Sequence, residues 1–302
     1  MSDFVQQNAS NVDFSSMGSD SWVILSPIEL SIKKKIEAVG VPLKDWDINI
    51  YRGVLTGYNE AFIISTDKRN EIVSNCQSED ERQRTEELIR PILRGRDIKR
   101  YGYDWAGLYL IATFPSRHYD IDQFPAVKAH LLSFGIERLE QTGKTHIVNG
   151  EKIKARKKTN NKWFETQDSI SYWDDFSKPK IAWGNLNLSA SFSFVENNFF
   201  LNAPCPMIVP GTTYLLRMLN SNIVDYCIRN LGVTRNGGYF EYKPMFVSQA
   251  KIPLVESLPT DLYTKILCES DENIINKLVA KAFNISDDEY EYIKSKLKPK
   301  QK

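Results

Sequence analysis

Residues 45–64 read DWDINIYRGVLTGYNEAFII and contain two apolar segments separated by a polar one. Trp46, Ile48 and Ile50 alternate with less apolar residues, which predicts a strand with one face on a core. The run 61–64 has the length of a second strand. Gly53 permits a tight turn between them, so the stretch predicts a strand-loop-strand hairpin.

The loop between these two runs carries the polar side chains of a recognition loop. Its candidate binding residues are Arg52, Thr56, Tyr58 and Asn59. Binding residues are often presented on loops that rigid elements hold in place. An ordinary connection between two strands has the same pattern, and the sequence leaves both interpretations open.

Bulk composition excludes several classes of protein. The chain has 302 residues, 42% of them hydrophobic, which is enough for a real core without disulfide bonds. Its four cysteines and three histidines share no metal-ligand spacing. No apolar run approaches the roughly 20 residues that cross a bilayer, and residues 1–21 lack the features of a signal peptide. We therefore expect a soluble cytoplasmic protein with reduced thiols.

The charge is nearly balanced overall but unevenly distributed. The formal net charge is +1, yet Lys144 to Lys162 contains seven basic residues and one acid, Glu151. Arg94 to Arg100 contains four basic residues and Asp97. Such runs can contact nucleic-acid phosphates, or they can be solvated loops, and charge alone does not decide between these.

The remaining chain predicts an α+β fold with a curved mixed β-sheet, flanking helices and a C-terminal helical segment. Capping signals predict helices from Ser26 to Gly40 and from Ser78 to about Ile89. The polar stretch 141–161 predicts a long surface loop or an extended hairpin. Strands are expected at 108–113, after Pro179 and through 192–200, a helix from about Pro125, a helical pair from Thr212 or Thr213 to Gly232, and three helices after Thr260.

Motifs for most catalytic chemistry are missing from these residues. There is no P-loop, GxSxG or HExxH motif, and no Asn/Asp-Pro-Pro-aromatic tetrapeptide of an amino-methyltransferase. Asp225, Glu241 and Lys243 form a loose carboxylate-carboxylate-lysine set that could bind magnesium in a nuclease. This nuclease and a protein-interaction module with a basic loop are the alternatives to a DNA-binding function.

Several ordered blocks resemble a known family. They are GVPLKDWDINIYRGVLTGYNEAFII, LIRPILRGRDIKRY, ARKKTNNKWFETQD, SYWDDFSKPKIAW and LLRMLNSNIVDY. Together they are similar to the TaqI-like C-terminal specificity domain of type IIG restriction-modification enzymes. The resemblance runs from about Trp22 to Val255. It implies sequence-specific recognition of duplex DNA for an adenine-N6 methyltransferase, which is often accompanied by a nuclease.

The resemblance assigns DNA-binding roles to three blocks. The first supplies the loop residues named above. The others supply Arg94, Arg96, Lys99, Arg100, Arg156, Lys157, Lys158, Asn161 and Trp163. Arginine can pair with guanine, and asparagine with adenine, in the major groove. No catalytic residue is expected in this chain.

The same resemblance implies a division of the chain and of the reaction. We expect a flexible tail at 1–21, a DNA target recognition domain at 22–255 and a helical segment at 256–302. No metal or cofactor is expected here, since S-adenosylmethionine and magnesium belong to catalytic domains that these residues do not contain. The expected partners are double-stranded DNA and a methyltransferase domain or subunit, with this chain as a fragment, a split subunit or a truncated gene.

Overall fold

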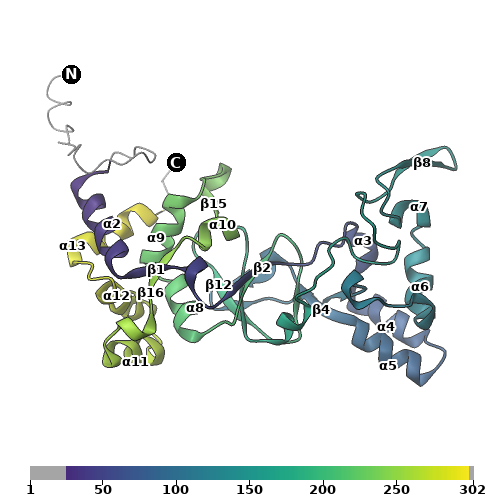
Figure 1. Ribbon diagram of the computed structural model, residues 1–302, viewed down its shortest axis with the longest axis horizontal. Coiled ribbons are helices and arrows are strands. Elements are labelled where there is room, and N and C mark those ends of the chain that lie inside the picture. The colour runs from purple at the N-terminus through teal and green to yellow at the C-terminus, as the bar shows by residue number, and fades with distance from the viewer. Residues whose placement is uncertain (1–24, 299–302) are drawn as a thin grey trace, which may run out of the picture.

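The computed structural model describes residues 25–298 of an elongated α+β protein (Figure 1). The tail predicted for residues 1–21 lies outside the described residues. Two hydrophobic clusters, which we name core A and core B, occupy the two ends of the molecule. Ile64, Leu110 and Leu131 belong to core A, and Ile36 and Val279 belong to core B.

Core A is covered by short helices and a mixed sheet of order β13-β4-β7-β3, in which β13 and β4 run parallel and the other pairs antiparallel. Its elements are α3 (Asn59–Phe62), β3 (Ile63–Ser65), α4 (Thr66–Ser74), α5 (Glu79–Leu88), β4 (Ile89–Leu93), β5 (Ile98–Lys99), β6 (Gly102–Tyr103), β7 (Leu108–Ile111), α6 (Pro125–Leu132), α7 (Ile136–Leu139) and β13 (Phe200–Leu201). The hairpin of β8 (Thr145–Val148) and β9 (Glu151–Lys154) projects from this end (Figure 1).

Core B is largely helical and joins the start of the described chain to its end. Its elements are α2 (Pro27–Val39), β1 (Gly40–Pro42), β11 (Leu186–Asn187), α8 (Thr213–Leu219), α9 (Asn222–Leu231), β15 (Phe240–Glu241), α10 (Pro244–Val247), β16 (Lys251–Pro253), α11 (Thr260–Cys268), α12 (Glu272–Ala282) and α13 (Asp287–Leu297). Apolar residues of α11, α12 and α13 lie in the same cluster as those of α2, α8 and α9. The C-terminal helices therefore help to close this core.

A four-stranded antiparallel sheet lies between the two cores. Its order is β12 (Phe192–Val195), β10 (Lys180–Trp183), β14 (Pro206–Val209) and β2 (Asn49–Arg52). Along β10, Ile181 and Trp183 face core B, whereas Ala182 faces core A. Successive residues of a strand point to opposite faces, so a sheet covered on both faces is apolar throughout. This explains why every residue of β10 and β14 is buried.

Most predicted helices are confirmed with their caps. Helix α2 has the capping box of Ser26 and Glu29 and ends at Gly40, and α13 has that of Ser286 and Glu289. Ser78 caps α5, and the pair α8 and α9 is joined at residues 220–221. Seven short 3-10 turns complete the described chain, at Leu43–Asp45, Gly95–Asp97, Pro115–Arg117, Ile121–Gln123, Trp173–Ser177, Asn236–Gly238 and Val255–Ser257.

The hairpin expected over residues 46–64 is wrong. Strand β2 pairs with β14, and β3 pairs with β7, so the two strands belong to different sheets. Ala61 and Phe62, expected in the second strand, belong instead to helix α3, Asn59–Phe62. The backbone of Gly53 explains the path, since a Cβ there would lie 2.4 Å from the Leu201 carbonyl oxygen. Val54 bonds to that same oxygen, so the chain continues from the central sheet toward core A.

No helix among residues 25–298 is long and apolar enough to cross a membrane. The four cysteines are free thiols, and Cys205 is fully buried. Burial raises the pKa of the Cys205 thiol to about 12, so it packs as an uncharged apolar group.

Candidate nucleic-acid interface

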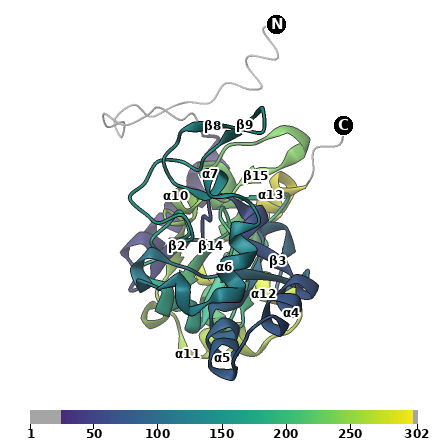
Figure 2. The same ribbon diagram turned by 90° about the vertical axis from the view of Figure 1, so that its right-hand side faces the viewer.

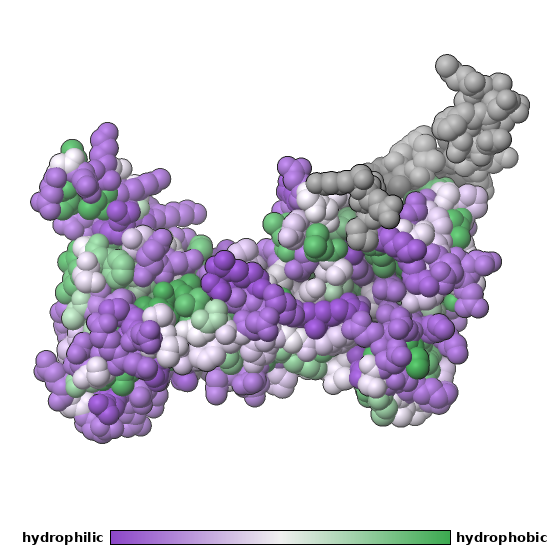
Figure 3. Space-filling view, turned by 180° about the vertical axis from the view of Figure 1, so that it is seen from behind, coloured by the Kyte–Doolittle hydropathy of each residue, from purple (hydrophilic) through white to green (hydrophobic). Residues whose placement is uncertain are grey.

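One side of the molecule is hollowed between its two ends. The β8–β9 hairpin and the segment that carries β15 both rise on this side (Figures 1 and 2). From behind, the surface between the two projections is a hollow (Figure 3). We call this side, between residues 145–154 and residues 240–241, the concave face. Residues 53–58 connect the sheet strand β2 to α3 between the two cores.

Arg156 is the structural centre of the loops next to the β8–β9 hairpin. Its guanidinium donates hydrogen bonds to the carbonyl oxygens of Leu139, Thr56, Glu165 and Trp163, at 2.7–2.8 Å. The side chain is 4% exposed, and burial lowers its pKa to about 10, at which it stays charged at neutral pH. Because all three nitrogens are used, Arg156 organises the interface and has no free nitrogen for a phosphate. Its predicted DNA contact does not fit this geometry.

Thr56 and Asn161 also act inside the loops. Thr56 is fully buried and its hydroxyl donates to Asn59 at 2.7 Å. The Asn161 amide donates to the carbonyl oxygens of Thr166 and Gln167 at 3.2 and 3.0 Å. Its burial and this bond leave Thr56 unable to reach a base. The backbone amides of Gln167 and Asp168 donate to the Leu55 carbonyl oxygen at 3.1 Å, which fixes the two loops relative to each other.

Arg52 is exposed at the end of strand β2, directly before the 53–58 loop. Its side chain is 62% exposed and contacts Asp168 at 2.8 Å. Tyr172 donates to the Arg52 carbonyl oxygen and stacks on Tyr51, with ring centroids 4.2 Å apart. Burial raises the pKa of Tyr172 to about 12, so this donor stays protonated. Asp168 and Tyr172 are not among the predicted site residues. They lie 116 and 120 residues from Arg52 in the sequence, and only folding brings them into contact with it.

Tyr58 and Asn59 lie at the start of α3. Tyr58 is half-buried, packs edge-on against Phe134 and lies 5.5 Å beneath the Arg138 guanidinium. Asn59 is exposed. Gly57 has a φ of +79°, and a Cβ there would lie 2.9 Å from the Gln167 side chain. Both the positive φ and the close contact with residues 156–167 therefore favour glycine at position 57.

The basic block at residues 94–100 forms one wall of a groove of about 670 Å³. Arg94 is held by Asp97 at 2.8 and 3.0 Å, and Arg100 by Glu272 at 2.9 Å. Burial opposes ionisation of Asp97, but the bonds from Arg94 hold its pKa below the ordinary value. Arg96 and Lys99 are exposed, and neither forms an ion pair within residues 25–298. The structure thus brings all four predicted residues to one groove and leaves two of them uncompensated.

The lysines around the β8–β9 hairpin have no acidic partners among residues 25–298. This group comprises Lys144, Lys152, Lys154, Lys157, Lys158 and Lys162. All six are exposed, and in the described part of the chain none of them forms an ion pair. Trp163 beside them is half-buried against core A, with its ring edge-on to Phe164. We name these six side chains the free lysines.

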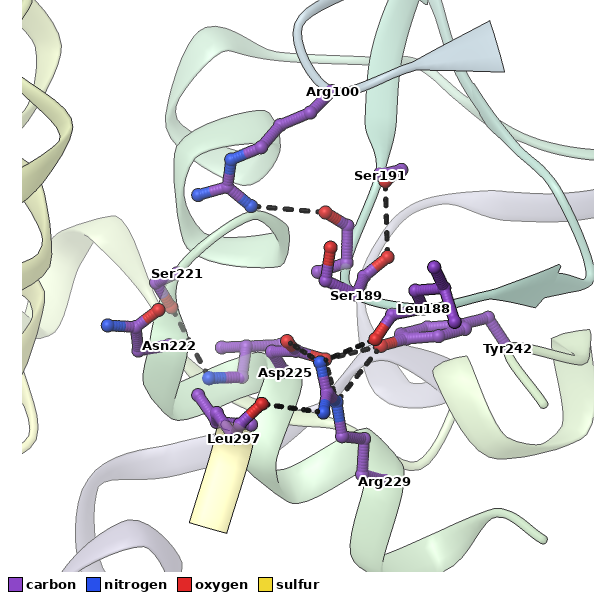
Figure 4. Close-up of polar contacts among 12 residues, drawn as sticks. Arg100, Leu188, Ser189, Ser191, Ser221, Asn222, Asp225, Arg229, Tyr242 and Leu297 are labelled. Carbon is purple, nitrogen blue, oxygen red and sulfur yellow. Dashed lines mark hydrogen bonds and ion pairs between the residues drawn. The ribbon is translucent and has the colours of Figure 1, made fainter. Parts of the chain in front are cut away.

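The carboxylates of the nuclease alternative, Asp225 and Glu241, pair with different basic side chains. Asp225 accepts two bonds of 2.9 Å from Arg229 and one from the Tyr242 hydroxyl (Figure 4). Glu241 is 3% exposed and pairs with Arg235 and with Lys243. Among residues 25–298 no three His, Cys, Asp or Glu side chains group to hold a metal ion. These contacts stabilise core B and give no support to a nuclease centre.

Comparison with solved structures finds the same fold in two larger proteins. One is the type IIL restriction-modification enzyme MmeI in complex with DNA, at 12% identity and a TM-score of 0.55 over 84% of this chain and 36% of that chain. The other is the type IIG restriction endonuclease BpuSI, at 14% identity and a TM-score of 0.53 over 90% of this chain and 32% of that chain. This chain spans about a third of the length of each.

A search of curated proteins finds no match. The model of the TaqI-like C-terminal specificity domain matches residues 90–254, which include the groove, the free lysines and the central sheet except β2. Since this match extends over more than half of the chain, the chain belongs to the TaqI-like C-terminal specificity domain family.

Proposed function

We propose that this chain reads a short sequence in duplex DNA as the specificity part of a restriction-modification enzyme. The observation that carries the proposal is the group of six lysines around the β8–β9 hairpin, which are exposed and form no ion pair within residues 25–298. DNA carries a dense row of phosphates, and each lysine that neutralises one releases a counterion. A surface on which cations lack acidic partners is available for that exchange.

Affinity and sequence preference have different sources in this proposal. Lys157 and Lys158 bind phosphates and set the affinity and its salt dependence. Arg52 and Asn59, exposed at the two ends of the loop that Arg156 fixes, contact base edges. A good bidentate contact contributes about 1–3 kcal/mol of discrimination against the wrong base. A fixed loop loses less conformational entropy on binding, which favours such contacts.

The catalytic steps belong to another domain or subunit in this proposal. An adenine-N6 methyltransferase that binds S-adenosylmethionine flips the target adenine out of the duplex and modifies it. A magnesium-dependent nuclease accompanies it in some enzymes of this type. This chain selects the site at which they act, and the role of its own residues is to bind and orient the duplex.

Selection from a randomised duplex library tests the proposal. The full chain is incubated with the library at two salt concentrations, and the bound fraction is sequenced. We expect enrichment of one short motif and weaker binding at the higher salt concentration. Binding without enrichment, or equal affinity for heparin and the selected duplex, would contradict sequence reading and favour an interaction with an acidic partner.

A further inference from the structure

The β8–β9 hairpin is an arm of regularly paired strands. Its strands pair antiparallel in the register Thr145 with Lys154, His146 with Ile153, Ile147 with Lys152 and Val148 with Glu151. Asn149 and Gly150 connect them with φ values of 52° and 84°. Two successive positive φ angles are typical of a type I′ turn, whose twist matches that of the strands. The arm is thus a regular two-stranded ribbon.

The base of the arm is fixed to the rest of core A. His146 contacts the Glu140 carboxylate at 2.5 Å, and the Ala155 amide donates to the Lys144 carbonyl oxygen at 2.9 Å. The Arg156 amide donates to the Glu140 carbonyl oxygen at 3.0 Å. The backbone hydrogen bonds of the arm therefore continue as far as Arg156, whose guanidinium is buried. The position of the arm therefore depends on the same residues that position the 53–58 loop.

The two faces of the arm differ in burial. Residues directly opposite in an antiparallel pair share a face. His146, Val148 and Ile153 form a half-buried face. Thr145, Ile147, Lys152 and Lys154 form the other face, and all four are exposed. Glu151 pairs with Val148 and lies on the first face, so the exposed face carries two cations and no acid.

Ile147 is the most exposed large apolar side chain among residues 25–298, at 74%. Lys152 lies directly opposite it, and Lys154 lies on the same face. An apolar protein surface would cover Ile147 only by desolvating these two uncompensated ammonium groups. The major groove of DNA offers both kinds of partner, phosphates at its edges and the C5-methyl group of thymine on its floor.

We propose that the exposed face of the β8–β9 arm enters the major groove and that Ile147 contacts a thymine methyl group there. The inference rests on the proposed function and adds a sequence-reading residue outside the loops. A two-stranded ribbon fits the major groove, which is about 12 Å wide. Lys152 and Lys154 bind the flanking phosphates, while Ile147 distinguishes a thymine from a cytosine at the same position.

The test uses the duplex enriched from the library, prepared once with thymine and once with deoxyuridine in its place. Uracil lacks only the C5-methyl group. We expect the wild-type chain to bind the uracil duplex about fourfold more weakly, since burying one methyl group contributes about 0.8 kcal/mol. Ile147→Ala should bind the thymine duplex more weakly and should discriminate less between the two duplexes.

Two matched variants separate this contact from other effects. Ile274→Ala removes another exposed isoleucine, 45% exposed on α12. It should keep the wild-type ratio of the affinities for the thymine and uracil duplexes. Lys152→Ala should weaken binding to both duplexes by the same factor. Ile147→Ala should unfold at the wild-type temperature, because the side chain is mostly exposed.

Each outcome decides the inference. The wild type could bind the thymine and uracil duplexes equally, or Ile147→Ala could show the same ratio of the two affinities as the wild type. Either result would overturn the methyl contact while leaving DNA recognition intact. Failure to enrich any motif would overturn the proposed function itself, and with it this inference. That failure would be seen before any arm variant is made.

Discussion

The two basic segments of this chain, at residues 94–100 and 152–162, resemble each other in sequence and differ in how their charges are compensated. In the first, Arg94 and Arg100 pair with Asp97 and Glu272. In the second, the one arginine is buried among carbonyl oxygens, and the lysines are exposed and form no ion pair with any residue that the structure describes. Charge density alone therefore does not identify a phosphate-binding surface.

The contrast is sharpest between Arg156 and Lys157, which are neighbours in the sequence. The Arg156 side chain is 4% exposed and its guanidinium bonds to four carbonyl oxygens, whereas Lys157 is exposed and unpaired within the described residues. A buried cation with carbonyl partners stabilises a fold, and an exposed unpaired one is free to bind an anion. The variants Arg156→Ala and Lys157→Ala test whether this difference in environment produces a difference in the free energy of unfolding.

Arg156→Ala should produce the largest change in stability. It leaves the carbonyl oxygens of Leu139, Thr56, Glu165 and Trp163 without this donor, and each buried unsatisfied group costs about 1–3 kcal/mol. Some of them will be reached by water, so we expect the free energy of unfolding to fall by about 3–5 kcal/mol. Urea denaturation measures it.

Lys157→Ala is the control for that experiment. The side chain is exposed, so we expect the free energy of unfolding to change by less than about 0.5 kcal/mol. Equal destabilisation by the two variants would contradict the distinction between a structural and a free cation.

Glu289 extends the contrast to core B and predicts an acid-sensitive stability. It accepts bonds from Lys35 at 2.7 Å and from Ser31 at 2.6 Å, which join α13 to α2. Burial opposes ionisation, but these bonds lower the pKa of Glu289 from 4.5 to about 2. The ionised form is bound in the folded state, so its stabilisation is complete above about pH 4.5 and is lost as the pH falls toward 2.

Unfolding of Glu289→Gln and of the wild type at a series of pH values measures this contribution. We expect the variant to be less stable by about 2 kcal/mol at pH 6 and the difference to shrink below pH 4.5. Asp261→Asn removes an exposed carboxylate, 72% accessible and paired with Lys265, and should change little. A constant difference between Glu289→Gln and the wild type down to pH 2 would contradict the assigned pKa.

Arg52→Ala should change sequence preference more than overall affinity. Arg52 is exposed directly before the loop that Arg156 fixes, and removal of a bidentate base contact removes about 1–3 kcal/mol of discrimination at one position. Repeating the library selection with this variant should relax the motif at one base pair. An unchanged motif with uniformly weaker binding would show that Arg52 contacts the backbone.

Local signals predicted much of the fold. The capping boxes at Ser26 and Ser286 and the apolar spacing of α8 and α9 gave helices close to those observed, because capping and periodicity act within a few residues. The residue pattern could not show that β2 and β3 belong to different sheets, because sheet pairing depends on distant strands β14 and β7.

DNA binding by the candidate residues stays a prediction, and the sequence indicated their arrangement in the fold for whole blocks and only partly for single residues. The block 94–100 forms one groove, and Lys157 and Lys158 are exposed as expected. Arg156 and Thr56 have the residue types of a DNA contact, but carbonyl oxygens of distant segments accept from the Arg156 guanidinium, and the buried Thr56 hydroxyl donates to Asn59. Carbonyl groups are present at every position of a sequence, so no residue pattern indicates which of them will converge on a guanidinium.

The salt dependence of DNA binding by Lys157→Ala,Lys158→Ala tests the central claim most directly. The slope of the logarithm of the association constant against that of salt concentration falls by about 0.9 for each phosphate that the protein no longer neutralises. We predict a slope smaller than that of the wild type by about two units, with the stability of the chain unchanged. The wild-type slope in the double variant would contradict the claim that the free lysines bind DNA phosphates.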